Sequence, residues 1–162
     1  MPDWFRPFRI LRFGGARTFS GVGMILHACF YRHFPTAPDD TGAAEPGDEE
    51  TGKFVILSRG EEVHLVLSPL AFTPYHADIV HQYLQAEGRG RVEAASSSGC
   101  RILSREWSVH GGGHYSAQHW LRHLRLHGKS SAFGKFEADR LAPFSDAIPD
   151  RLGLAGYTLE LD

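Results

Sequence analysis

The clearest indication of fold is the stretch KFVILSRGEEVHLVLS, residues 53–68. Residues 53–58 and 62–68 are rich in β-branched and aromatic side chains, and the turn Arg59-Gly60-Glu61 separates them. Two such runs joined by a short glycine-containing turn are typical of a β-hairpin. We therefore expect a sheet to begin here.

Helix and strand patterns alternate after this hairpin. Thr73-Pro74 predicts a helix start, because threonine caps helices and proline suits the first helical position. This helix is expected to end near Glu87, before Gly88. A second helix is expected over residues 136–141, ended by Pro143. Short strands or irregular pieces are expected at residues 91–94, 101–104, 107–109, 124–127 and 157–161.

The order of these elements gives the fold class. Gly111-Gly112-Gly113 predicts a break between strands, and no repeat or sustained βαβ alternation is present. The sequence therefore predicts one α+β domain, with a mixed sheet of about six strands flanked by two helices.

Charge divides the chain into three parts. Residues 1–36 hold five arginines against one acid, and we expect a basic arm that is poorly structured or loosely docked. Residues 37–52 hold six acids and no base, which indicates an acidic linker. Residues 53–162 hold twelve charges of each sign and form the expected domain, with no necessary core element before Lys53. A scaffold that binds partners through the arm is a further alternative.

Composition excludes several function classes. The net charge of −2 argues against a nucleic-acid binder, and no apolar run approaches the ~18 residues of a membrane span. Cys29 and Cys100 form no CxxC motif, which favours a reducing compartment and a cytoplasmic location.

His76 is the first candidate for chemistry. It lies three residues after Thr73, in the first turn of the expected helix. The positive end of the helix dipole disfavours a charged imidazole there, and a neutral ring can act as a base or a nucleophile. The alternative is a histidine that only packs at a helix start.

The second candidate is the small-residue loop from Gly128 to Gly134. Backbone N–H groups near a helix start can hold phosphate, and Ser130 and Lys129 would add a hydroxyl and a charge. The loop is not a Walker motif, and an ordinary connection is the alternative.

Histidines gather in the following region. His119, His123 and His127 would share one face of a helix, a possible metal arrangement. The same residues also fit a strand, and no carboxylate or thiolate within the cluster completes a site. We therefore predict no metal site.

Four segments together resemble the protein histidine phosphatase family, also called the Janus or Ocnus family. They are KFVIL from Lys53, YHADI at residues 75–79, the triple glycine at 111–113, and LHGKSSAFG at 126–134. Their order is also that of the family, and the resemblance covers residues 53–162. It implies a Janus-like α+β domain that hydrolyses phosphohistidine in proteins or peptides, with no metal or cofactor.

The resemblance also implies roles for single residues. His76 matches the catalytic histidine, and Lys53 matches a lysine that faces the phosphate. Ser130, with the N–H groups of Ser131 and Ala132, matches the phosphate-holding loop.

Two positions differ from animal members of the family. His114 follows the triple glycine where those members have arginine, so a group that titrates near neutral pH replaces a fixed cation in contact with phosphate. Ala138 stands where they have a second histidine. The alternative function is therefore a non-catalytic phosphate- or phosphopeptide-binding module on the same fold.

Overall fold

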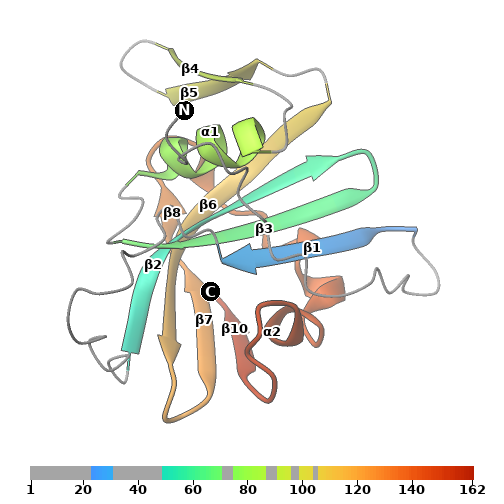
Figure 1. The fold of residues 1–162 in the computed structure, drawn as a ribbon, viewed down its shortest axis with the longest axis vertical. Helices are drawn as coiled ribbons and strands as arrows, with labels where there is room; N and C mark the ends of the chain where they lie inside the picture. The colour runs from blue at the N-terminus through green and yellow to red at the C-terminus, as the bar shows by residue number, and fades with distance from the viewer. Residues whose placement is uncertain (1–22, 31–48, 71–74, 87–90, 96–98, 104–105) are drawn as a thin grey trace, which may run out of the picture.

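The computed structural model describes residues 23–30, 49–70, 75–86, 91–95, 99–103 and 106–162 (Figure 1). Within this part of the chain, a curled mixed sheet follows the order β1-β3-β2-β6-β7-β10, and β8 and β9 pair beside β6. Its strands are β1 (Ile25–Phe30), β2 (Glu49–Arg59), β3 (Glu62–Pro69), β6 (Trp107–Gln118), β7 (His123–His127), β8 (Lys129–Ser130), β9 (Gly134–Lys135) and β10 (Thr158–Leu161). The β1–β3 and β7–β10 pairs are parallel, whereas β2 is antiparallel to both neighbours. The predicted α+β class with a mixed sheet is confirmed.

The hairpin of β2 and β3 is confirmed, with Gly60 in its turn at a φ of +58°. A second hairpin, β4 (Arg91–Ala95) with β5 (Gly99–Leu103), lies beside helix α1 (His76–Ala86) (Figure 1). The predicted start of this helix at Thr73-Pro74 and its predicted end at Glu87 lie outside the described residues.

Alternation along the strands divides the core into two layers. Val55, Leu57 and Val66 pack under α1, against the helix residues Ile79 and Leu84. Side chains of the opposite parity face the other layer, which the segment 136–152 covers. The core members of this second layer are Phe54, Ile56, Leu65, Leu67, Tyr115, Leu124 and Leu126, with Phe136, Leu141, Phe144 and Ile148 from the covering segment.

The prediction of a second helix over residues 136–141 is wrong. The segment instead forms two 3₁₀ turns, η2 (Ala138–Arg140) and η3 (Ala142–Phe144), followed by the four-residue helix α2 (Ile148–Arg151). Pro143 contributes to the difference, because it has no N–H group to donate to the carbonyl of Asp139, so an α-helix over this segment cannot continue through it. The segment still buries its apolar side chains against the sheet.

The expectation that no core element precedes Lys53 is also wrong. Strand β1 pairs with β3, and Leu26 is buried in the core with 5% of its surface exposed. Met24, Ala28 and Phe30 share the parity of Leu26 and pack against the same core. Strand β2 already begins at Glu49, so the sheet takes residues from both segments that the charge pattern separates from the domain.

The break between strands that the sequence predicts at the triple glycine is wrong, because these residues lie within the continuous strand β6. A Cβ atom at Gly111 would overlap the Lys135 carbonyl, and one at Gly113 would overlap the His127 carbonyl. These glycines therefore permit close backbone approach rather than a turn. Among the described residues, no helix is long and apolar enough to cross a membrane.

Candidate functional site

Three basic side chains form a row across neighbouring strands. Lys53 on β2 pairs in register with His114 on β6, and His114 pairs with His127 on β7. Lys53 has the parity of Val55, so the row lies on the face of the sheet that α1 covers. The imidazole rings of His114 and His127 are stacked, with 6.1 Å between their centroids. We call Lys53, His114 and His127 the basic row.

His76, the first residue of α1, lies against this row. Its side chain is buried, and its ring centroid is 5.7 Å from that of His114. The Nε2 atom of His76 is 2.7 Å from the carbonyl oxygen of Gly113. The helix and β6 thus bring His76 to the place where the sequence analysis expects a phosphate site.

The contact with Gly113 determines which nitrogen of His76 carries the proton. A carbonyl oxygen only accepts hydrogen bonds, so a neutral His76 ring donates its proton from Nε2. The lone pair of the neutral ring is then on Nδ1. This Nδ1 atom makes no hydrogen bond with the described residues, and it is not fully enclosed by them.

The surroundings also keep His76 neutral. Burial lowers its pKa most, and the charges of Lys53 and His114 lower it further, while the bond to Gly113 opposes them. The pKa of His114 is lowered by burial first and then by Lys53 and His127. Within the basic row, the His114 imidazole is therefore less readily protonated than free histidine.

Gly112 allows this arrangement. A Cβ atom at that position would lie 2.5 Å from the carbonyl oxygen of Phe54 and 3.1 Å from Cδ2 of His76. The first distance is shorter than real Cβ contacts allow, and the second is tighter than nine in ten of them. The His76 ring can thus lie flush against β6 because the strand has no side chain there.

The loop from Gly128 to Gly134 begins beside the basic row, since a Cβ atom at Gly128 would lie 3.3 Å from Cδ2 of His114. Ser130 is buried, and its Oγ atom accepts hydrogen bonds from the N–H groups of Ala132 (3.2 Å) and Phe133 (3.1 Å). The loop leads into β9 rather than into a helix start, which corrects that part of the expectation. Phosphate binding by Ser130, Ser131 and Ala132 stays a prediction.

Sequence reasoning did not place His127 or Tyr75 at this site. The sequence suggests a shared helix face for His119, His123 and His127, but β7 is a strand, so the three do not share one. His114 and His127 lie equally far from the β6–β7 turn, which could have indicated that they pair. Tyr75 is 67% exposed, and its ring centroid is 5.7 Å from the Lys53 amine.

Ala138 does not belong to this site. It packs against the core layer on the opposite face of the sheet, among residues of the segment 136–152. A missing histidine at this position therefore removes no group from the neighbourhood of His76 in this chain.

Comparisons with known proteins add no family to this description. No protein-family model matches the chain, and no curated protein matches it. The fold and the site therefore define a basic, imidazole-containing surface on a mixed sheet.

Proposed function

We propose that this chain is a metal-independent hydrolase of phosphohistidine, or of a related phosphoramidate, in proteins. The observation that carries the proposal is the environment of His76, whose Nε2 faces a carbonyl while Nδ1 is left with a lone pair beside the basic row. The resemblance to the protein histidine phosphatase family supports it. Membership of that family, its Janus-like fold and a cytoplasmic location belong to the same proposal.

The basic row supplies the charge that phosphoryl transfer requires. Catalysis of this transfer is mostly positioning and stabilisation of anionic oxygens. The Lys53 side chain brings a formal positive charge, and the rings of His114 and His127 make no hydrogen bond with the described residues. These groups can therefore meet a phosphoryl group next to His76.

Two routes use the Nδ1 atom of His76. As a nucleophile it forms a bond to phosphorus while the P–N bond of the substrate breaks, and the leaving imidazole nitrogen keeps the electron pair and gains a proton. Water then hydrolyses the phosphorylated His76. As a base, Nδ1 takes a proton from water while the water oxygen attacks phosphorus directly, the P–N bond breaks, and the leaving imidazole nitrogen keeps the electron pair and gains a proton. Both routes yield inorganic phosphate and the unmodified substrate histidine.

The test is phosphate release from a phosphohistidine peptide, measured with EDTA present. We expect turnover by the wild-type chain and a loss of about 10²–10⁴-fold in His76→Ala, because a positioned acid–base group contributes that much. His119→Ala is the matched control, since His119 bonds to Tyr157 elsewhere in the molecule. Equal rates in wild type and His76→Ala would sink the mechanism.

A rapid quench without acid separates the two routes. Phosphate trapped on His76 at early times supports the nucleophile, because only that route forms a bond between Nδ1 and phosphorus. Its complete absence at early times, during normal turnover, supports the base.

A non-catalytic phosphate- or phosphopeptide-binding module is the second candidate. The observation that favours it is His114, which lies in the basic row where animal members of the family have arginine. Burial, Lys53 and His127 lower the pKa of His114, so this position offers less positive charge to a transition state than a fixed cation would. Phosphohistidine peptide that binds without phosphate release would establish this function.

A further inference from the structure

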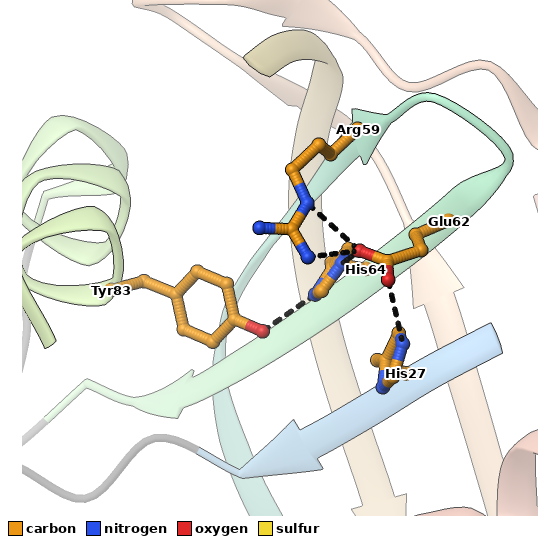
Figure 2. Close-up of polar contacts among 5 residues, drawn as sticks. All are labelled: His27, Arg59, Glu62, His64 and Tyr83. Carbon is orange, nitrogen blue, oxygen red and sulfur yellow. Dashed lines mark hydrogen bonds and ion pairs between the residues drawn. The ribbon is translucent and has the colours of Figure 1, made fainter. Parts of the chain in front are cut away.

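A second group of polar side chains lies at the other end of α1. Figure 2 shows His27, Arg59, Glu62, His64 and Tyr83, which come from four different elements and point toward one another. In this group, one nitrogen of His27, one oxygen of Glu62 and one nitrogen of His64 all lie within 4.8 Å of one another. None of the five has a role in the proposed hydrolysis.

The sheet register builds this cluster. Strand β1 pairs with β3 so that His27 is opposite His64, and Glu62 lies two residues before His64, on the same face. The Glu62 Oε2 atom is 3.3 Å from Nε2 of His64, and its Oε1 atom is 4.0 Å from Nε2 of His27. Two imidazoles and a carboxylate thus converge although His27 and Glu62 lie 35 positions apart in the sequence.

We propose that His27, Glu62 and His64 form a binding site for one divalent transition-metal ion of the Zn²⁺ class. Imidazole nitrogen and carboxylate oxygen are ligands that Zn²⁺ prefers, and three protein ligands leave a position open to water. The site is accessible, because 45% of the His27 side chain and 26% of the Glu62 side chain are exposed. This proposal does not rest on the proposed hydrolysis.

Tyr83 gives the buried ligand an orienting partner. Its Oη atom is 2.6 Å from Nδ1 of His64. Metal-binding histidines typically use their second ring nitrogen in such a bond. In the metal-free chain, a neutral His64 carries its proton on Nε2 and donates a hydrogen bond to the Glu62 carboxylate. Metal binding at Nε2 requires the other tautomer, with the proton on Nδ1, where His64 donates a hydrogen bond to Tyr83.

Arg59 and the stacking of the two rings set limits on the geometry. The Arg59 guanidinium contacts Oε2 of Glu62 at 2.8 Å and 3.0 Å, so Oε1, the oxygen toward His27, is the ligand atom for the metal. The rings of His27 and His64 are stacked at 4.5 Å and 20°, so one must turn before both lone pairs meet at one ion. His27 is the ring that turns, because it is exposed whereas His64 is buried.

The metal would act on the structure rather than on the hydrolysis. Tyr83 lies seven positions after His76 on α1, which is roughly 10 Å along the helix axis. An ion held by His27 and His64 joins the edge strand β1 to β3 at a distance from the basic row. Hydrolysis that resists EDTA is therefore compatible with a metal site in the same chain.

The test is titration of Zn²⁺ into tag-free, chelator-stripped protein, followed by calorimetry and by thermal unfolding. We expect one saturable site per chain and a rise in Tm with Zn²⁺, since a ligand that binds only the folded state stabilises it. His27→Ala and Glu62→Gln should each abolish this site and the rise in Tm. Tyr83→Phe should weaken binding about 10- to 100-fold, as loss of an orienting partner does.

The matched control is His123→Ala. His123 also contacts a carboxylate, that of Glu160 at 3.1 Å, and it belongs to no group of three converging ligand atoms among the described residues. Binding that is intact in His123→Ala and lost in His27→Ala supports the site. Absence of a saturable site in the wild type, or equal binding by wild type and His27→Ala, would overturn it.

Discussion

At the scale of single residues, His76 and Ser130 show how the hydrogen bonds of a buried side chain decide which of its atoms can still bind a ligand. The Nε2 atom of His76 is bound to Gly113, which leaves Nδ1 for chemistry. The Oγ atom of Ser130 is bound to two backbone N–H groups, which uses its acceptor capacity within the loop. Of the two, His76 is the residue whose local bonds prepare it for a reaction.

Lys53→Gln should move the acid limb of the pH–rate profile to higher pH. His76 acts as the neutral ring, so the rate falls as pH drops through its pKa. Lys53 lowers that pKa, and its removal raises it toward the ordinary value of histidine. The measurement is kcat/KM for a phosphohistidine peptide from about pH 5 to about pH 8.

Lys135→Gln is the control for this prediction, because it removes an exposed lysine that does not act on the pKa of His76. Its acid limb should coincide with that of the wild type. An acid limb at the same pH in Lys53→Gln and wild type would show that Lys53 does not act on His76 electrostatically.

At the scale of elements, β6 is the strand on which the candidate site is assembled. It presents the Gly113 carbonyl to His76, holds His114 between Lys53 and His127, and has no side chain under the His76 ring. Strand and helix can approach this closely only where glycine replaces a larger residue.

Gly112→Ala should therefore impair both stability and hydrolysis. The added methyl group would press on the Phe54 carbonyl and on the His76 ring, and overpacking of this kind costs about 1–3 kcal/mol. Urea unfolding and phosphate release measure the two effects. Gly60→Ala is the comparison, because its strain lies in a turn with open space around it. It should lower stability but leave the rate of the folded protein unchanged.

Leu26→Ala tests whether β1 belongs to the core. Leu26 is 5% exposed, and buried Leu→Ala changes cost about 2–5 kcal/mol. Leu121→Ala is the matched control, because Leu121 is 51% exposed and should change the free energy of unfolding by less than about 0.5 kcal/mol. Equal unfolding midpoints for the two variants in urea would mean that β1 does not contribute to the core.

Local patterns predicted the elements that have a clear turn or an alternating run of their own. The β2–β3 hairpin follows from residues 53–68 alone, and β7 and β10 follow from short alternating runs, although the two strands pair in parallel 35 positions apart. Strand β1 was missed because residues 25–30 are apolar except for His27 and show no clean alternation, so only the distant pairing with β3 identifies the strand. The glycines of β6 were misinterpreted for a similar reason, since their close neighbours belong to other strands.

Only part of the candidate site could likewise be predicted from the sequence. His76 and Lys53 were expected from their place in the chain and from the resemblance, and the fold brings both to His114. His127 joins them through the register of β6 and β7, and the His27–His64 pair arises through β1. The first register follows from the sequence only once the β6–β7 turn is located, and the second, a parallel pairing of distant segments, leaves no signal in the spacing of the residues.

At the scale of the whole molecule, the buried and half-buried histidines should make the fold sensitive to acid. Burial is the largest cause that lowers the pKa of His76, His110 and His114 in the folded chain. Below the ordinary histidine pKa near 6.5, the unfolded chain thus binds more protons than the folded one. The free energy of unfolding should therefore fall as pH drops from about 7 to about 5.

Urea unfolding at these two pH values measures the loss, and His110→Gln identifies part of its origin. His110 contacts Ser58 at 2.7 Å and Glu137 at 3.5 Å, on the strand that also carries His114. Glutamine does not titrate, so the loss of stability between the two pH values should be smaller in this variant. A loss as large as that of the wild type would show that His110 takes up its proton equally well in the folded and unfolded chains.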